Sequence, residues 1–518
     1  MTHCRRVTVS NHSTRVNDSR VLEQVHPVGW TNPTAADRYH LVVIGAGTGG
    51  LVSAAAAAGL GARVALIERH LMGGDCLNVG CVPSKAVIRA GRAWREAREA
   101  EQRFGGPSVS AAGDFGVAME RMRRLRADLS PVDGAARFRD LGVDMFLGDG
   151  QFVAHDAVEV DGQALRFRRA VIATGARATV PNIRGLDRVS YYTNETIFSL
   201  TARPEHLVVV GGGPIGCELA QAFARLGTRV TLLNRGTQLL PRESPDAAAI
   251  VEASLVHDGV TVLHGAEIAS VANADAHADA DADASILVTV RVGSDERVLV
   301  TDAFLLAVGR TPNVGGMGLE AARVRFDAQR GVEVNDRLQT SNPRVYAVGD
   351  VCSAMQFTHA ADFQARLVVQ NALFFGRGKA RALIVPRVTF TSPEVASIGL
   401  TEEDAVLRGV AVDVVTVPLH DVDRATLDDE TNGFCRMVLA RGTDRIVGAT
   451  IVAEHAGENI GEVAVAMTAT LGLHVIGRTM HPYPTQGEML RKCADAWRRR
   501  KLTPTVKSIF ATYFRWVR

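Results

Sequence analysis

The sequence contains 518 residues, of which 47% are hydrophobic and 22% are charged. At roughly 150 residues per domain, this length suggests three or four domains. The 58 Lys and Arg residues nearly balance the 56 Asp and Glu residues, which gives a formal net charge of +2. This balance excludes the charge excess typical of nucleic-acid-binding and membrane-surface proteins and favours a small partner.

Cysteine usage and the N-terminal residues indicate the compartment. Seven cysteines are too few for a disulfide scaffold in a chain of this length, and residues 1–20 contain charges where a secretory signal needs an apolar run. The apolar stretch from Leu51 to Ile67 is interrupted by Arg63, so it falls short of the roughly 18 residues of a spanning helix. We therefore expect a cytoplasmic protein with no membrane and no nucleic acid as partner.

Residues 1–38 mix polar and charged residues without a period, so we expect a flexible, loosely held arm. The apolar run from His40 to Ile44 then predicts a buried strand, and the glycine-rich segment after it predicts a turn into a helix. A second strand is expected from Arg63 to Glu68. Together these segments form a βαβ unit.

The turn of this unit has the spacing of a dinucleotide-binding fingerprint. Gly45 permits the tight turn, Gly47 lets a pyrophosphate approach the backbone, and Gly50 allows close packing of strand and helix. Glu68 ends the second strand and can accept hydrogen bonds from both ribose hydroxyls of an adenosine such as that of FAD. A strand–turn–helix without a ligand is the alternative interpretation.

A second copy of the pattern begins at His206 and contains Gly211, Gly213 and Gly216, followed by a helix through Arg225 and a strand from Arg229. The residue that ends its second strand lies 23 residues after the first glycine, as in the first copy. The repeat predicts a second nucleotide-binding fold.

The end of that strand bears on the choice of nicotinamide cofactor. Asn234 and Arg235 occupy the place where an NAD-selective site has a carboxylate for the ribose 2′-hydroxyl. This favours a 2′-phosphate, and therefore NADPH over NADH, although NADH stays open; Arg242 could assist.

Two cysteines, Cys76 and Cys81, follow the first nucleotide unit. Residues five apart in an ideal α-helix have Cα atoms about 8 to 9 Å apart, beyond the roughly 7 Å limit for a disulfide. A disulfide therefore requires an irregular first turn, for which Gly80 gives conformational freedom. A helix running on from Val82 would lower the pKa of a thiolate at its start. Two inert buried thiols are the alternative.

The later part of the chain changes in character. Between Asn273 and Ala284, Ala alternates with Asp or His, which we interpret as a solvated hairpin tip rather than a metal-binding tract. From Pro386 onward, short β-rich runs precede an apolar helix expected from Glu462 to Leu473. These runs indicate a separate domain.

The C-terminal tail is basic. From Arg491 onward, nine Lys and Arg residues face one acid, Asp495, and four aromatic residues are interleaved with them. RNA or membrane contact is one interpretation. We favour an amphipathic tail that packs on its own protein.

Several motifs together resemble one enzyme family. These are the two glycine-rich units, the run from Cys76 to Lys85, and the segments 173–175, 307–310 and 345–350. In combination they resemble the flavin-dependent pyridine nucleotide–disulfide oxidoreductases (class I), a family that includes dihydrolipoamide dehydrogenase, glutathione reductase and mercuric reductase. The resemblance covers about residues 39–500 and is greatest to mercuric-reductase-like members.

The resemblance implies an α/β fold with two Rossmann-like dinucleotide-binding domains, for FAD and NAD(P), and a C-terminal α+β dimerisation domain. The expected segments are the arm at 1–38, the FAD-binding domain at 39–186 and 313–380, the NAD(P)-binding domain at 187–312, the dimerisation domain at 381–500 and the basic amphipathic tail at 501–518.

The resemblance also implies roles for individual residues. Cys81 is the flavin-facing thiol, and Cys76 is the outward thiol that exchanges with substrate. Lys85 pairs with Glu218 beside the isoalloxazine, and Asp350 binds the ribityl chain. The implied FAD-binding residues are Gly45, Gly47, Gly50, Glu68, Lys85, Gly150, Thr174, Gly175, Asp350 and Thr358, and the implied NAD(P)-binding residues are Gly211, Gly213, Gly216, Asn234, Arg235 and Gly309. No bound metal is expected.

The match departs from the family near the C-terminus. Disulfide reductases of the family have a His of the partner subunit, backed by a Glu five residues later, that moves the proton of the exchanging thiol. Here Tyr483 stands in that position before Glu488, as in mercuric reductases. His481 could substitute for the missing base. We expect neither the N-terminal metal-binding domain nor the terminal cysteine pair of a complete mercuric reductase.

Three functions follow as hypotheses. The first is a homodimeric enzyme, completed by the partner's C-terminal domain, that passes electrons from NAD(P)H through FAD and the cysteine pair to a small-molecule or metal-ion acceptor such as Hg(II). The second is a disulfide reductase of the dihydrolipoamide or glutathione type that uses His481. The third is a flavin-binding redox sensor or scaffold whose tail engages a partner.

Overall fold

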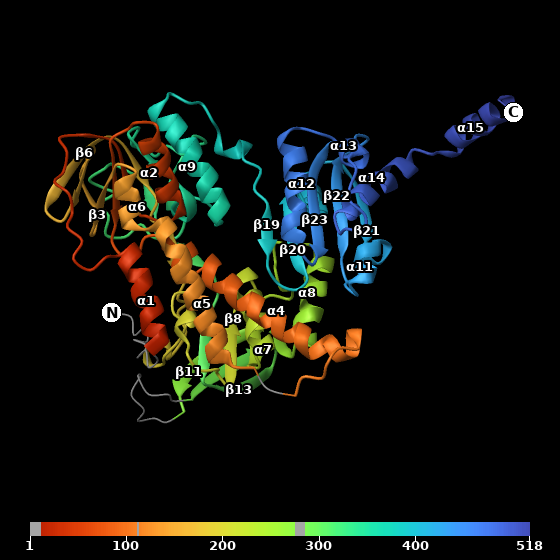
Figure 1. Ribbon diagram of the computed structural model, residues 1–518, viewed down its shortest axis with the longest axis horizontal. Helices are drawn as coiled ribbons and strands as arrows, with labels where there is room; N and C mark the ends of the chain where they lie inside the picture. Colours follow the sequence, from red (N-terminus) through yellow and green to blue (C-terminus); the bar gives the residue numbers. More distant parts are fainter. Residues whose placement is uncertain (1–11, 111–112, 275–284, 518) are drawn as a thin grey trace. The chain divides into compact units, whose positions relative to one another are not determined.

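The computed structural model describes residues 12–110, 113–274 and 285–517 (Figure 1). The chain divides into two compact units. The first comprises Met1–Arg98, Ser108–Thr237 and Gly259–Leu383, and the second comprises Glu99–Pro107, Gln238–Asp258 and Ile384–Arg518.

The first unit contains a seven-stranded sheet in the order β3-β2-β1-β6-β5-β4, with β18 also paired to β6. The strands β3, β2, β1, β6 and β18 pair in parallel, and β4, β5 and β6 form an antiparallel extension. Their bounds are β1 Tyr39–Ile44, β2 Val64–Glu68, β3 Val143–Leu147, β4 Gln151–Ala154, β5 Ala157–Val160, β6 Gln163–Ile172 and β18 Val345–Ala347. Strands β1 and β2 read as apolar runs because a parallel sheet is buried on both faces.

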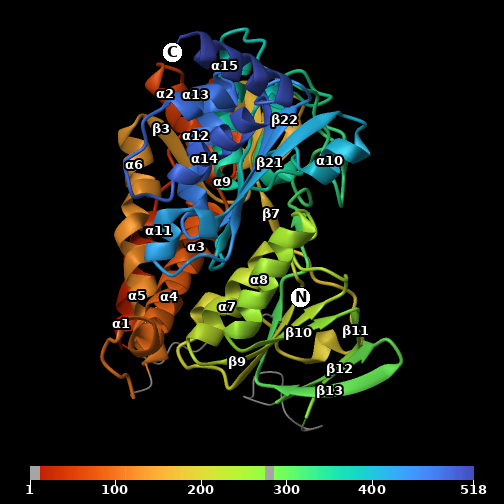
Figure 2. The same cartoon turned by 90° about the vertical axis from the view of Figure 1, so that its right-hand side faces the viewer.

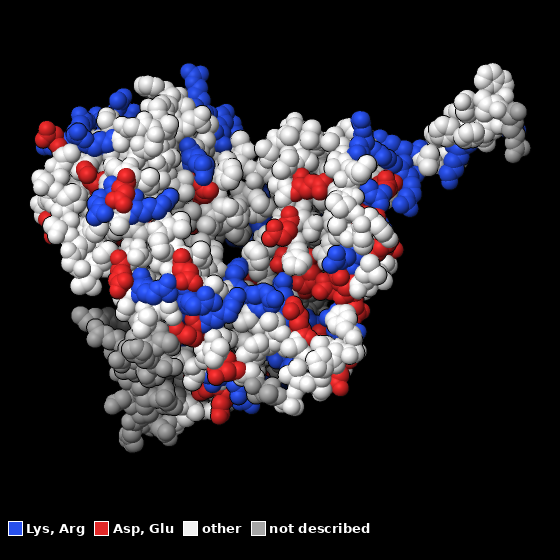
Figure 3. All heavy atoms as spheres, in the orientation of Figure 1, with Lys and Arg blue, Asp and Glu red and all other residues white. Residues whose placement is uncertain are grey.

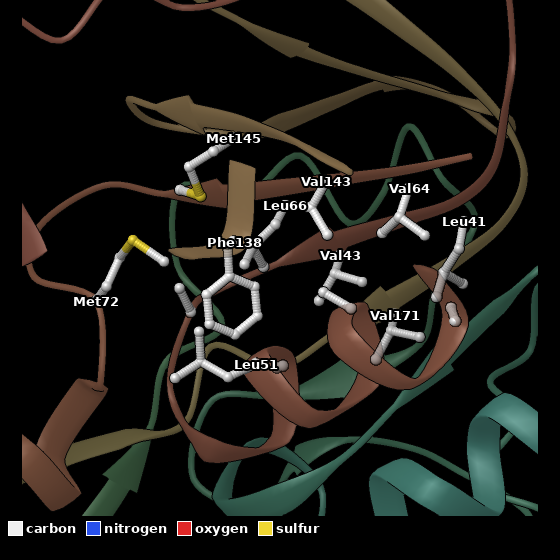
Figure 4. Packing of buried hydrophobic residues seen from close by; sticks show 14 of the residues in the cluster. Leu41, Val43, Leu51, Val64, Leu66, Met72, Phe138, Val143, Met145 and Val171 are labelled. Carbon is white, nitrogen blue, oxygen red and sulfur yellow. The ribbon is translucent and has the colours of Figure 1, made fainter. Parts of the chain in front are cut away.

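Helix α2 (Thr48–Gly59) covers this sheet and packs against α9 (Thr358–Leu373). The Ala-rich sequence of α2 lets the helix approach closely. Figure 4 shows Leu51 of α2 with Val43, Leu66 and Phe138 in the resulting core, and no labelled side chain is more than 6% exposed. This core fixes the turn between β1 and α2.

A second parallel sheet in the same unit has the order β10-β9-β8-β14. It consists of β8 (His206–Val210), β9 (Arg229–Asn234), β10 (Val260–His264) and β14 (Ala303–Leu306), and α7 (Pro214–Arg225) packs against β8 and β9. An antiparallel ribbon of β11 (Ala266–Asn273), β12 (Ile286–Val292) and β13 (Asp295–Thr301) follows β10 (Figure 2). The two predicted Rossmann-like folds are confirmed.

The expected hairpin tip at 273–284 falls almost entirely on residues 275–284, which lie outside the described residues. The flanking strands β11 and β12 pair antiparallel, with Asn273 opposite Ile286.

The second unit contains an antiparallel sheet in the order β19-β20-β23-β22-β21. Helix α12 (Ala456–Thr468) packs against β20 and β23, and α14 (Glu488–Arg500) packs against β21 and β22. The strands are β19 Arg387–Thr389, β20 Glu394–Gly399, β21 Val412–Pro418, β22 Phe434–Ala440 and β23 Ile446–Ala453. This arrangement is the predicted C-terminal α+β domain. The helix expected over 462–473 is interrupted, because α13 (Leu473–Arg478) begins separately.

The remaining elements connect these layers. They are α1 His12–Val25, α3 Gly74–Asn78, α4 Cys81–Phe104, α5 Phe115–Leu129, α6 Ala135–Asp140, α8 Pro245–His257, α10 Glu402–Leu407, α11 Asp423–Leu427, α15 Pro504–Trp516, β7 Ala176–Ala178, β15 Arg310–Pro312, β16 Phe326–Asp327 and β17 Gly331–Val332. Among the described residues, no helix is both long enough and apolar enough to cross a bilayer.

Residues 12–38 are not the flexible arm that the sequence predicts. Val21 and Val25 of α1 are buried in the core of the first unit. The side chain of Asn32 donates to the carbonyl of Leu147 at 3.0 Å and accepts from its N–H at 2.8 Å. The prediction was wrong because two apolar residues and a few polar anchors hold this segment without a periodic pattern.

The C-terminal tail also differs from its prediction. It forms the helix α15, but none of its described residues is buried. The expectation that the tail packs on its own protein is therefore wrong within the described chain.

Replacing Val25 with Ala tests the packing of α1. Because the side chain is 0% exposed, we expect the free energy of unfolding to fall by about 1–3 kcal/mol, measured by urea denaturation. Val28 is 98% exposed, so Val28→Ala is a matched control that should change stability by less than about 0.5 kcal/mol. Equal stabilities for the two variants would show that α1 is not held in the core.

Candidate redox and dinucleotide sites

The two glycine-rich turns are built in the same way. A Cβ on Gly45 would lie 2.5 Å from the carbonyl oxygen of Ala173, and one on Gly211 would lie 2.4 Å from that of Ala307. Both glycines have a positive φ, 98° and 116°. In each turn, a Cβ on the third glycine, Gly50 or Gly216, would lie within 2 Å of the carbonyl oxygen of the first glycine. These four positions exclude any side chain.

The middle glycines differ from the outer ones. A Cβ on Gly213 would meet no atom within 4 Å, and one on Gly47 would meet only the Cα of Gly74 at 3.8 Å. Packing therefore does not require glycine there. The space left open at the start of α2 and of α7 fits a pyrophosphate that approaches the backbone and the positive helix end.

Glu68 has the environment expected of a ribose-binding carboxylate. One oxygen accepts from the N–H of Ala46 at 2.7 Å, and the other accepts from the N–H of His70 at 2.8 Å. Burial raises the pKa of Glu68, and these two hydrogen bonds oppose the rise. Each oxygen keeps a lone pair for a further donor, so the carboxylate fits the two hydroxyls of an FAD ribose.

Arg310 joins two carboxylates in the first unit. Its guanidinium pairs with Asp75, which precedes the first redox cysteine, and its Nε lies 3.2 Å from Asp350. It also donates to the carbonyl of Ala176 at 2.7 Å. Burial raises the pKa of Asp350, and Arg310 opposes that rise. Arg310 lies in the 307–310 motif, but no role was predicted for it from the sequence.

The other predicted FAD and NAD(P) positions shape the backbone around these sites. Thr174 donates to the carbonyl of Asn313 at 2.8 Å. Gly175 and Gly309 have φ values of 65° and 131°, which favour glycine. A Cβ on Gly150 would lie 3.1 Å from the side chain of Ile67.

Asn234 and Arg235 lie at the end of β9, as the sequence predicts. The amide of Asn234 is buried and donates to the carbonyl of Gly236 and to the ring of His264, both at 3.0 Å. Arg235 is exposed, and no ion pair joins it to another described residue. Arg242 is exposed as well. Arg235 is thus a cation available to an anionic ligand at the strand end.

The two predicted redox cysteines lie on two successive helices. Helix α3 ends at Asn78, and α4 begins with Cys81 itself. The expected irregular turn is present, but the role of Gly80 differs from the prediction. Its φ is not positive; instead, a Cβ there would lie 2.7 Å from the carbonyl oxygen of Asp75 and 3.6 Å from the Cα of Cys76. Glycine is needed because the two helices approach closely.

The two sulfurs have opposite pKa shifts. The pKa of Cys81 is lowered to about 6, first because Cys76 donates a hydrogen bond to it and further because of Thr358 and Lys85. The same hydrogen bond, with burial, raises the pKa of Cys76. Thr358 Oγ1 lies 3.3 Å from Cys81 Sγ. Near neutral pH the reduced pair is therefore a Cys81 thiolate and a Cys76 thiol.

The implied ion pair between Lys85 and Glu218 is present. Lys85 Nζ lies 2.8 Å from Glu218 Oε2, and the Glu218 side chain is only 7% exposed. The ion pair connects α4 with α7. These two helices pack closely at Gly91, where a Cβ would lie only 3.0 Å from the carbonyl oxygen of Ala222. The contact places a cation one helical turn from Cys81.

In the second unit, Tyr483 is 70% exposed and donates to Asp423 at 2.9 Å. Lys492 lies 3.3 Å from the other oxygen of Asp423. The Tyr483 hydrogen bond lowers the pKa of Asp423, and the same contact raises the pKa of Tyr483. Tyr483 is therefore a hydrogen-bond donor and not a base.

His481 and Glu488 have separate partners. His481 Nδ1 donates to the carbonyl of Thr479 at 3.0 Å, and Nε2 faces Glu462 at 3.1 Å. Glu488 pairs with Arg491, and its Oε2 is buried without a partner. Within the described chain, no hydrogen bond joins Glu488 to Tyr483 or His481. From the sequence, Glu462 was expected only as the start of an apolar helix, and its contact with His481 was not predicted.

Within residues 12–110, 113–274 and 285–517, no group of three or more His, Cys, Asp or Glu side chains is placed to hold a metal ion. Cys217, Cys435 and Cys493 are buried, whereas Cys352 is half-buried.

Comparison with known proteins identifies similar sequences and structures. Residues 39–365 match the pyridine nucleotide-disulphide oxidoreductase family, and residues 385–494 match its dimerisation domain. A mercuric reductase from Lysinibacillus sphaericus is 34% identical over 468 residues, which covers 89% of this chain and 84% of the relative. A dihydrolipoyl dehydrogenase from Staphylococcus aureus is 33% identical over 461 residues, covering 88% and 95% of the two chains.

A solved structure is similar across both units. The HOCl-induced flavoprotein disulfide reductase RclA from Escherichia coli is 28% identical, with a TM-score of 0.77. The similarity covers 88% of this chain and 99% of that chain.

Replacing Cys76 with Ala in the reduced holoenzyme should raise the pKa of Cys81 from about 6 towards the ordinary thiol range, because it removes the largest stabilising contact of the thiolate. The pH dependence of iodoacetamide alkylation, read by peptide mass spectrometry, measures this. Cys352→Ala is the control, since burial and the charge of Asp350 raise that thiol's pKa to about 12. An unchanged alkylation midpoint in Cys76→Ala would show that the two sulfurs do not interact.

Proposed function

Because the chain belongs to the pyridine nucleotide-disulphide oxidoreductase family, we propose that it transfers electrons from NAD(P)H through FAD and the Cys76–Cys81 pair to a thiol-reactive acceptor, of which Hg(II) is the leading candidate. The family depends on FAD and a pyridine nucleotide. When bound, FAD supplies the redox chemistry that connects hydride donation by NAD(P)H with reduction of the cysteine pair. Glu68, Asp350 and the first glycine turn would hold it.

The asymmetry of the sulfur pair is the observation that carries this proposal. Cys81 is poised as a thiolate beside Lys85, whereas Cys76 keeps its proton. Soft metal ions prefer thiolate ligands. Binding such an ion through both sulfurs requires Cys76 to release its proton, so acceptor binding is expected to be coupled to proton release.

The proton balance separates the two acceptor classes. Reduction of Hg(II) by NAD(P)H yields Hg(0), NAD(P)⁺ and one released proton. Reduction of a disulfide by NAD(P)H consumes one proton and yields two thiols. A disulfide reductase therefore needs a group that delivers protons to a leaving thiolate. Tyr483, with a raised pKa and its proton donated to Asp423, is poorly suited to that task, which supports the metal-ion reading.

The matched dimerisation domain supports a homodimer. Tyr483 and His481 both lie within it. We propose that Tyr483 of the partner subunit completes the acceptor site, where its phenol would act as a hydrogen-bond donor or ligand.

A disulfide reductase is the second candidate, and one observation favours it. His481 faces Glu462, which is the base–carboxylate arrangement that a thiol proton shuttle uses. The side chain of His481 is only 8% exposed and both ring nitrogens already have partners within the second unit.

His481→Ala should separate these candidates. If the acceptor is a metal ion, NADPH-dependent Hg(II) reduction by the variant should stay near the wild-type rate, measured anaerobically by loss of NADPH. If the enzyme reduces lipoamide or glutathione disulfide with His481 as acid–base group, that activity should fall by about 100-fold or more.

Cys76→Ser should abolish every acceptor activity while FAD stays bound. Full activity in Cys76→Ser, or negligible turnover with all acceptors, refutes the proposed function, and the latter favours a redox sensor.

We also propose that NADPH is the preferred reductant, because Arg235 is an exposed cation at the end of β9 without a carboxylate beside it. Arg235→Glu should raise the KM for NADPH by about 10-fold or more, since hydrogen bonds to charged groups contribute about 1.5–3 kcal/mol. The KM for NADH should change much less. Arg229→Glu, at the exposed start of the same strand, is the matched control; equal effects of Arg235→Glu on both cofactors would contradict the assignment.

A further inference from the structure

No described residue of helix α15 is buried, although one face of the helix is apolar. With a turn of 100° per residue, its large apolar side chains fall within an arc of about 160°. The fractional exposures of Phe514 and Trp516 are 62% and 82%. The apolar face comprises Val506, Ile509, Phe510, Tyr513, Phe514, Trp516 and Val517, and the opposite face carries Lys507, Ser508, Thr512 and Arg515.

Local signals specify this helix. Thr503 caps it, accepting from the N–H of Val506 at 3.3 Å, and Pro504 is the first helical residue. A helix of 13 residues without tertiary contacts is marginal in water. Burial of the apolar face would therefore stabilise it.

The charge around α15 has a single sign. From Arg498 to Arg518 the sequence has seven Lys and Arg residues and no Asp or Glu. Since the whole chain has a net charge of +2, the rest of the chain carries −5. Figure 3 shows basic side chains gathered where α14 ends, next to the start of α15. The expectation of no membrane partner was based on the net charge of the whole chain. That value does not reveal a local segment of positive charge.

We propose that α15 and the basic end of α14 bind the surface of a bilayer that contains anionic lipids. Such a surface offers negative headgroups and an apolar layer at one boundary, which matches both faces of α15 at once. Trp516 and Tyr513 are residue types that favour this boundary. At 13 residues, α15 is too short to span a membrane, which takes roughly 20, so it lies in the plane of the interface.

Other partners match only one property of the segment. RNA would neutralise the cations and could stack on the aromatic rings, but it would leave Val506, Ile509 and Val517 in water. A symmetric dimer in which α15 met its own equivalent would bring two segments of the same charge together. An anionic bilayer has neither defect.

Flotation of the full-length holoenzyme with vesicles tests the proposal. The protein should float with vesicles of equimolar phosphatidylcholine and phosphatidylglycerol, should not float with phosphatidylcholine alone, and should lose binding in 1 M salt, where the Debye length is about 3 Å. Phe510→Glu should lower the affinity at least about tenfold, because burying an aromatic side chain is worth about 1.5–3 kcal/mol. Arg499→Gln and Arg500→Gln should each lower it by about fivefold.

Phe375→Glu is the matched control, since Phe375 is 81% exposed but lies outside the tail; it should float like the wild type. All these variants should keep NADPH-dependent acceptor reduction in solution, so failure of flotation is distinguishable from failure of the proposed function. Equal flotation with both vesicle types, or undiminished flotation of Phe510→Glu, overturns the proposal. Amide-exchange protection of residues 504–516 without vesicles also overturns the proposal, because it would mean that a second copy already covers them. Binding to single-stranded RNA in the absence of flotation overturns it as well.

Discussion

The hydrogen bond between Cys76 and Cys81 is the interaction on which the proposed chemistry depends, and a break in the helical backbone makes it possible. Helix α3 ends before α4 begins with the second cysteine, so the sulfurs are not separated by the rise of one continuous helix. Gly80 permits the close approach. The contact stabilises one sulfur as a thiolate and keeps the proton on the other, which gives two chemically different thiols within one short segment.

Both dinucleotide-binding folds contribute to the surroundings of this cysteine pair. The predicted FAD-binding fold directly precedes the cysteines in the sequence. The predicted NAD(P)-binding fold contributes Glu218 from α7, the helix that follows its glycine turn. The two turns share one construction, in which the first and third glycines pack and the middle one stays open. The same backbone arrangement thus leaves space at both predicted phosphate sites. The ion pair of Lys85 with Glu218 connects them at the start of α4.

Much of this could be predicted from the sequence, because buried parallel strands read as apolar runs and phosphate-binding turns have fixed glycine spacing. Strand β8 begins at His206, the predicted residue. The anchoring of α1 could not be predicted, since Val21 and Val25 are too few to make a period. The partners of Arg310 lie 235 and 40 residues away, and no local pattern encodes such a contact. The pairing of Tyr483 with Asp423 is missed for the same reason.

The bridge made by Arg310 has a mechanical consequence. One guanidinium connects helix α3, which carries Cys76, through Asp75 with Asp350, the carboxylate expected to bind the flavin's ribityl chain. The side chains of Arg310 and Asp350 are only 15% and 20% exposed, so a shift of Arg310 would leave Asp350 without its countercharge in a poorly solvated place. The segment of the predicted exchanging sulfur and the predicted cofactor site thus share one ion-pair bridge, so a displacement of Arg310 would weaken the anchoring of both acids at once.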